Sequence, residues 1–195
     1  MTLSSIAVFC ASSPGYDEKY MQEAYRLGAY LSEKHIRVIY GGARVGLMGA
    51  VADGALSAGG EVIGVLPVFL QDKEVAHQNL SELIWVESMH ERKMKMHALS
   101  DGVICLPGGF GTLEVTFEML TWGQLGLHQK PVGLLNMNGF FTSLLDFLDQ
   151  MVVAGFLKQS NRDMLLEAGE AAALLQTMSD YQPVRVEKWI SKGRT

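Results

Sequence analysis

Short apolar runs alternate with longer helical patterns along almost the whole chain, and this order limits the possible folds more than any other feature. The runs are continuous stretches of Val, Ile and Leu, so each strand is expected to be covered on both faces. We expect strands at residues 5–10, 36–40, 61–66, 83–86, 102–106 and 131–135, and helices at residues 17–34, 46–58, 89–99, 112–125 and 140–154. Strands and helices that alternate in this way form a parallel sheet with right-handed crossovers. The predicted fold is a single α/β domain over residues 1–195, a Rossmann-like doubly wound parallel sheet with helices on both faces.

The C-terminal part has weaker patterns. Residues 170–178 have helical spacing, and residues 183–190 suggest a short terminal helix that packs Trp189. The last five residues are expected to be frayed.

Composition excludes several classes of protein. The chain has 195 residues, with 16 basic and 21 acidic side chains and a net charge of −5, so we do not expect a nucleic-acid partner. No apolar run is long enough to span a bilayer, so no membrane partner is expected. Two cysteines in apolar runs and no secretory leader indicate a cytoplasmic protein. The five histidines have no metal-ligand spacing, so no metal site is predicted.

Two glycine-rich turns stand where an expected strand is followed by an expected helix. The first, at residues 107–112, reads Pro-Gly-Gly-Phe-Gly-Thr, and the second follows Tyr40 with two adjacent glycines. Glycine lets the backbone turn tightly and leaves main-chain amides unhindered by a Cβ. Thr112 is predicted to be the N-cap of the next helix, whose N-terminus attracts phosphate through its partial positive charge. Because the carboxyl ends of parallel strands meet at one edge, both turns are expected to border one anion site. A turn without a ligand is the alternative.

Charged residues near these turns are the candidates for chemistry. Arg92 and Lys93 are neighbours in an expected helix, where Arg92 could hold a phosphate or a ribose through paired hydrogen bonds. Glu114 would place a carboxylate beside a bound phosphosugar, and Glu118 shares its helix face one turn later. Glu74, in an irregular segment, could hydrogen-bond a base or a ribose. For each of these side chains the alternative is a solvated surface charge.

Taken together, these segments resemble the LOG ("lonely guy") family over nearly the whole chain. The resemblance rests on Val8-Phe9-Cys10-Ala11-Ser12-Ser13, Gly46-Leu47-Met48-Gly49, Met89-His90-Glu91-Arg92-Lys93, residues 107–112, residues 121–126 and Lys130-Pro131-Val132-Gly133. Family members are cytokinin riboside 5′-monophosphate phosphoribohydrolases, often labelled lysine decarboxylase-like. The resemblance implies hydrolysis of the N-glycosidic bond of cytokinin or purine nucleoside 5′-monophosphates to free base and ribose 5-phosphate, without a cofactor.

The resemblance also implies roles for individual residues and a quaternary structure. Arg92 would serve catalysis. The residues implied to bind substrate or phosphate are Ser13, Gly42, Glu74, Lys93, Gly108, Gly109, Phe110, Gly111, Thr112 and Thr121. A homodimer is implied, with the site completed across the interface.

One position departs from the family pattern Pro-Gly-Gly-x-Gly-Thr-x-x-Glu. Its final glutamate is regarded as catalytic, but this chain has Val115 there and Glu114 one residue earlier. Thr112 and position 115 also have capping-box spacing, so valine is expected to remove a reciprocal cap. Two interpretations stay open. In the first, Glu114, our candidate catalytic carboxylate, or Glu118 takes the role of the missing glutamate. In the second, the chain binds nucleotide with weak or no turnover.

Two other enzyme classes fit less well. Amino-acid decarboxylation needs a lysine Schiff base with pyridoxal phosphate, and no lysine lies in a context that identifies one. A dinucleotide-dependent dehydrogenase needs Gly-x-Gly-x-x-Gly and an acidic residue after the second strand, which neither glycine turn provides.

Overall fold

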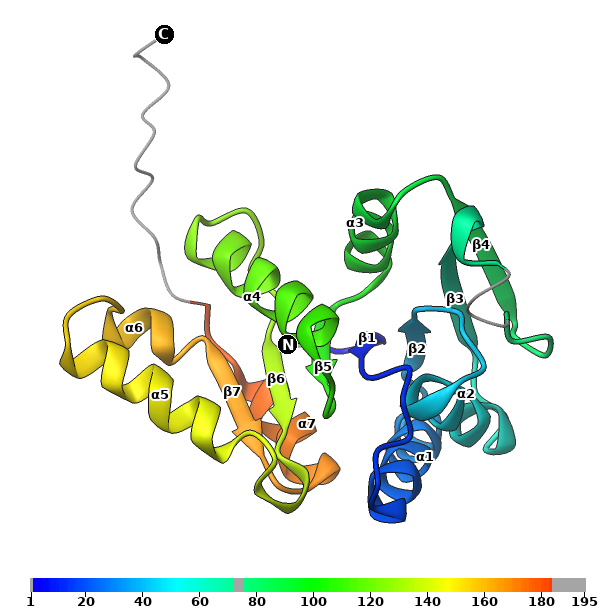
Figure 1. The fold of residues 1–195 in the computed structure, drawn as a ribbon, viewed down its shortest axis with the longest axis horizontal. Helices are drawn as coiled ribbons and strands as arrows, with labels where there is room; N and C mark the ends of the chain where they lie inside the picture. The colour runs from blue at the N-terminus through cyan, green and yellow to red at the C-terminus, as the bar shows by residue number, and fades with distance from the viewer. Residues whose placement is uncertain (1, 72–75, 184–195) are drawn as a thin grey trace, which may run out of the picture.

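The computed structural model describes residues 2–71 and 76–183, which contain a seven-stranded parallel sheet (Figure 1). The strands are β1 (Ser5–Phe9), β2 (Arg37–Tyr40), β3 (Val62–Pro67), β4 (Glu82–Val86), β5 (Gly102–Cys105), β6 (Val132–Leu135) and β7 (Leu165–Ala168). Their spatial order is β4-β3-β2-β1-β5-β6-β7. The predicted Rossmann-like, doubly wound fold is confirmed, and the direction of winding reverses between β1 and β5.

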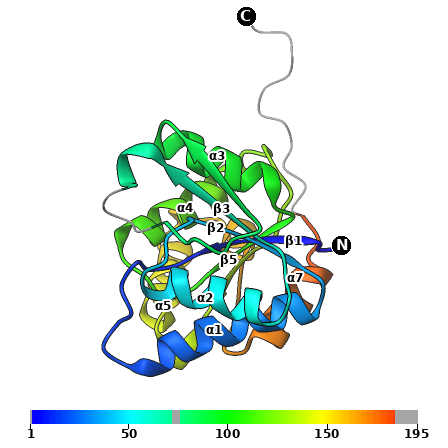
Figure 2. The ribbon, with the colours of Figure 1, turned by 90° about the vertical axis from the view of Figure 1, so that its right-hand side faces the viewer.

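Helices cover both faces of this sheet, as predicted (Figure 2). They are α1 (Glu18–Glu33), α2 (Gly46–Ser57), α3 (Met89–Leu99), α4 (Phe110–Gln124), α5 (Thr142–Val153), α6 (Gln159–Arg162) and α7 (Ala171–Asp180), with 3₁₀ turns at Val68–Leu70 and Met137–Gly139. Alternate residues of each strand point to opposite faces. In β1, Ile6 and Val8 pack with α1, α2 and α7, whereas Ala7 and Phe9 pack with α3, α4 and α5.

The structure contains a strand and a helix that we did not expect, and the expectations for the C-terminal residues fall outside its described range. All six expected strands and the helices expected before residue 180 are present, but β7 and α6 were missed. The expected helix at residues 183–190 lies outside the described residues apart from Pro183. Within the two described ranges, none of the helices combines the length and apolar character needed to cross a bilayer.

Helices α1 and α2 pack backbone against backbone through glycine. A Cβ added to Gly28 of α1 would lie 2.0 Å from the carbonyl oxygen of Val51 in α2. A Cβ added to Gly54 of α2 would lie 2.0 Å from the carbonyl oxygen of Tyr25 in α1. Both contacts are with rigid backbone, so any side chain at either position must separate the two helices.

We therefore expect Gly54→Ala to destabilise the fold by about 1–3 kcal/mol, the usual cost of overpacking a core. Alanine has the higher helix propensity, so a loss of stability would isolate the packing effect. Urea unfolding of both proteins measures the difference. Gly169→Ala is the matched control, because a Cβ at Gly169 meets nothing within 4 Å. Equal stability of Gly54→Ala and the wild type would contradict the proposed packing constraint.

Candidate active site

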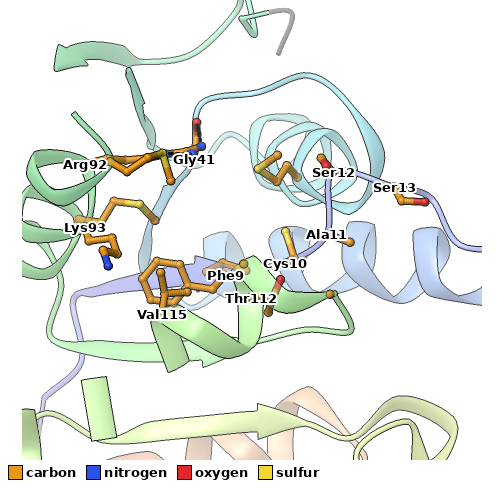
Figure 3. Close-up of a pocket in the computed structure, with 16 residues that line it drawn as sticks. Phe9, Cys10, Ala11, Ser12, Ser13, Gly41, Arg92, Lys93, Thr112 and Val115 are labelled. Carbon is orange, nitrogen blue, oxygen red and sulfur yellow. Dashed lines mark hydrogen bonds between the residues drawn. The ribbon is translucent and has the colours of Figure 1, made fainter. Parts of the chain in front are cut away.

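A cavity of about 420 Å³ opens at the carboxyl edge of the sheet, where β1 and β5 pair (Figure 3). Its lining comes from β1 and the loop after it, the turn after β2, and helices α2, α3 and α4. Open α/β sheets bind their ligands at the point where strand order reverses. The cavity occupies this position.

The glycine turn after β5 exposes main-chain amides at the cavity. Helix α4 begins at Phe110 with Gly109 as its N-cap, so the prediction of Thr112 as the N-cap is wrong. The helix starts earlier because Gly109 already has the extended conformation of an N-cap. The N–H groups at residues 110–112 consequently have no intrahelical acceptor. A Cβ at Gly109 or Gly111 would meet nothing within 4 Å, so an anion can approach this turn closely.

Thr112 has a different role from the predicted one. It is the third residue of α4, buried, and it lines the cavity. A Cβ at Gly108 would lie 2.1 Å from the Thr112 Oγ1, so the threonine side chain fills the space above that glycine. The expected loss of a reciprocal cap at Val115 does not apply either, because position 115 is not the third residue after the N-cap.

Arg92 is a buried cation held against the backbone at the cavity. Its side chain comes from α3, and its Nε donates to the carbonyl oxygen of Val65 at 3.0 Å. Its Nη2 donates to the carbonyl oxygen of Gly41 at 2.5 Å, and Figure 3 shows the two residues side by side. A Cβ on Gly41 would lie 2.2 Å from Nη2, so only glycine permits this contact. These bonds fix the position of the guanidinium beside the space for a ligand.

Lys93 lines the cavity and forms ion pairs with two carboxylates of α4. Its Nζ lies 2.7 Å from Glu114 Oε1 and 2.8 Å from Glu118 Oε2. Burial alone would lower the pKa of Lys93, but the hydrogen bonds to Glu114 and Glu118 outweigh burial and raise that pKa. The side chain of Glu114 is 57% exposed and that of Glu118 is 23% exposed, so solvent screens Glu118 less.

Val115 lines the cavity as a buried apolar side chain. It packs in the core formed by α3, α4 and α5, together with Phe9 and Met119. None of the described residues that line the cavity is acidic. Any carboxylate that this chain brings to the reaction from α4 must therefore reach it from Glu114 or Glu118.

The remaining predicted residues are divided between the cavity and other places. Ser13 lines the cavity, whereas Gly42 does not and the neighbouring Gly41 does. Phe110 is exposed beside the cavity. Thr121 lies further along α4, exposed, with its hydroxyl bonded to the Phe117 carbonyl oxygen. Glu74 lies outside the described residues.

Sequence reasoning missed much of the apolar lining. Met48, Met89 and Met96 all border the cavity. The helical spacing of Met89 and Met96 with Lys93 was the available signal, because it places them on one face. Cys10, one of the two cysteines in apolar runs, also lines the cavity, and burial raises its pKa.

The fold and this cavity define a Rossmann-like α/β protein with a candidate anion site where the strand order reverses. Comparison with known proteins makes the assignment more specific. Residues 48–178 match the family described as "Possible lysine decarboxylase". The chain is 45% identical over 189 residues to cytokinin riboside 5′-monophosphate phosphoribohydrolase LOG5 of Arabidopsis thaliana, covering 97% of this chain and 82% of the relative.

Further similarities agree with this match. The probable phosphoribohydrolase LOGL9 of Oryza sativa subsp. japonica is 44% identical over 179 residues, covering 92% of this chain and 79% of the relative. The X-ray structure of TM1055 has a TM-score of 0.70 and 25% sequence identity, covering 91% of this chain and 99% of that one. The chain belongs to the LOG family, as the sequence motifs indicated.

We expect Gly111→Leu to block the anion site without harming the fold. Its Cβ enters open space, and leucine raises helix propensity by up to about 1 kcal/mol over glycine. Calorimetric titration with inorganic phosphate should show at least tenfold weaker binding, while the melting temperature stays equal or rises. Gly111→Ala, which leaves the turn accessible, is the control. Undiminished phosphate binding by Gly111→Leu would show that the anion binds elsewhere.

Proposed function

We propose that this chain hydrolyses the N-glycosidic bond of cytokinin or purine nucleoside 5′-monophosphates, releasing the free base and ribose 5-phosphate. The observation that carries the proposal is the presence of the α4 glycine turn and Arg92 at one cavity, in a chain whose relatives are named phosphoribohydrolases. The helix N-terminus favours the dianionic phosphate. The guanidinium of Arg92 can donate hydrogen bonds to phosphate or ribose oxygens. Its high pKa makes it a poor acid, so its role is to hold and polarise the substrate.

Departure of the base leaves positive, oxocarbenium-like charge on the ribose. A nearby carboxylate stabilises this charge or orients the attacking water. A single charge at about 4 Å is worth roughly 4 kcal/mol at an effective dielectric of about 20. That energy corresponds to about a thousandfold in rate. We propose that Glu114 or Glu118 supplies this carboxylate, with Lys93 holding both side chains next to the cavity.

Nucleotide binding with weak or no turnover is the second candidate function. The observation that favours it is Val115, which gives the cavity a methyl surface where the family pattern has a carboxylate. Phosphate and sugar contacts would persist without that group. Retention of a nucleotide would then be the function of the site.

Lysine decarboxylation, suggested by the family's description, fits the site poorly. A Schiff-base lysine must lose its proton, so such sites lower the pKa of the amine. Lys93, the lysine among the described lining residues, has a raised pKa because Glu114 and Glu118 stabilise its charged form. The ion pairs therefore oppose this chemistry.

The direct test is to incubate the purified protein with AMP and with isopentenyladenosine 5′-monophosphate. We expect chromatography to show release of base and ribose 5-phosphate in equal amounts from at least one substrate. Arg92→Lys should lower turnover at least tenfold, because lysine cannot make both of the hydrogen bonds that fix the guanidinium. No release above buffer, together with tight binding by calorimetry, would favour the second candidate function; neither release nor binding would reject both.

Three variants of α4 identify the carboxylate. We expect either Glu114→Gln or Glu118→Gln to lower kcat by about a thousandfold, as the electrostatic argument predicts. The other substitution should have a much smaller effect. If Val115→Glu instead raises activity strongly, the natural chain is an impaired enzyme. Full activity in both glutamine variants would contradict the role assigned to this pair.

We also propose that two copies of the chain pair through the side of the molecule that carries α3 and the end of α4. Large apolar side chains stay exposed on these elements, namely Met94, Leu125 and Leu127. Such side chains commonly mark a protein interface. A partner on this side would lie near Thr121, which is exposed on α4. The residue could then contact substrate in the other copy.

Light scattering after size-exclusion chromatography tests this pairing. We expect the wild type to elute with the mass of two chains. Met94→Glu combined with Leu127→Glu should shift the mass toward one chain, because buried unpaired charges are costly at an interface. Phe156→Glu, also exposed but located after α5, is the control. A wild type that stays monomeric at micromolar concentration would overturn the proposal.

A further inference from the structure

His77 is a buried histidine outside the lining of the cavity, and both of its ring nitrogens are engaged. Its exposed fraction is 4%. Its Nε2 lies 3.0 Å from Oδ1 of Asp53 on α2, and the backbone N–H of Asn79 donates to its Nδ1 at 3.2 Å. Because a backbone N–H can only donate, Nδ1 is the acceptor and the ring proton is on Nε2. His77 thus donates to Asp53 as a neutral ring of fixed orientation.

The backbone of His77 holds the turn after β2. Its N–H donates to the carbonyl oxygen of Gly42 at 3.0 Å. The preceding residue, Ala76, forms an antiparallel bridge with Ala43. The ring contact with Asp53 and this bridge together restrain where the backbone donor lies relative to the turn.

The turn itself consists of two successive glycines, the residues with the greatest backbone freedom. Gly42 has a φ of +79°, which favours glycine. The Gly41 carbonyl accepts from Arg92, and the Gly42 carbonyl accepts from His77. These two carbonyls belong to successive planar peptide units that meet at the Cα of Gly42, so only the φ and ψ of this one residue separate their directions. The contact of His77 with Gly42 is thereby coupled to the contact of Gly41 with Arg92.

We infer that His77, oriented by Asp53, is a positioning residue that holds the Gly41-Gly42 turn and through it the Arg92 guanidinium. Neither His77 nor Asp53 lines the cavity. The effect of His77 and Asp53 on the position of Arg92 does not depend on which reaction the protein catalyses. Their effect on turnover rests on the function proposed above. The pair acts on the substrate only through the arginine.

The first measurement follows Arg92 directly. In ¹⁵N NMR spectra the Nε–H signal of Arg92, assigned by its loss in Arg92→Lys, should be sharp in the wild type because Val65 accepts from it. We expect the signal to shift or broaden in His77→Ala and in Asp53→Ala. Asp53 is 59% exposed, so its truncation leaves the fold intact even if His77→Ala does not fold. Asp53→Asn keeps an acceptor oxygen, and His77→Gln keeps a donor at the place of Nε2, so both should retain the signal.

The second measurement is kinetic. With AMP as substrate we expect His77→Ala and Asp53→Ala each to lower kcat/KM about tenfold, and the double variant to be no worse, because both remove one interaction. Leu174→Ala truncates a fully buried residue of α7 and is the destabilised control, with its kcat/KM expected to stay near the wild-type value. An unchanged Arg92 signal in both alanine variants would overturn the inference. If the wild type hydrolyses no nucleotide, the proposed function fails, and the NMR signal still decides whether His77 positions Arg92.

Discussion

The reversal of strand order between β1 and β5 is the constraint on which the site depends. The chain leaves β1 toward the face covered by α1 and leaves β5 toward the face covered by α4. The two connections therefore diverge, and a crevice remains above adjoining strand ends. Backbone amides, a helix N-terminus and the side chains of α3 reach this crevice because the sheet brings their elements to one edge. The strand order therefore accounts for the place of the cavity, whichever residues line it.

Much of this fold could be predicted because buried parallel strands consist of continuous apolar residues. The exceptions have physical reasons. β7 has Leu-Leu-Glu-Ala at the edge of the sheet, with only Leu165 fully buried, so it lacks the signal of a strand covered on both faces. The start of α4 was placed two residues late because threonine is a common N-cap, whereas here glycine takes that position. Composition alone does not distinguish these two starts.

The site could be predicted in its residue types and less well in its contacts. Glycine, arginine and lysine in the right order indicated an anion site, but the ion pairs of Lys93 depend on how α3 packs against α4. Likewise, Gly41 rather than Gly42 borders the cavity, and its carbonyl accepts from Arg92, a residue of α3 that lies 51 positions later in the chain. His77 had no signal in the sequence, since an isolated histidine in an irregular segment is ordinarily a surface residue. Interactions between elements distant in sequence are the part that local patterns cannot provide.

Three methionines beside the cavity have a consequence for selectivity. Thioether side chains are unbranched and polarizable, so they adapt their rotamers to the shape of whatever aromatic group they contact. On the function proposed above, Met48, Met89 and Met96 can therefore accommodate flat heterocycles that differ in their substituents, while the glycine turn holds the charged end. Discrimination in such a pocket would rest on the sugar phosphate rather than on the leaving heterocycle.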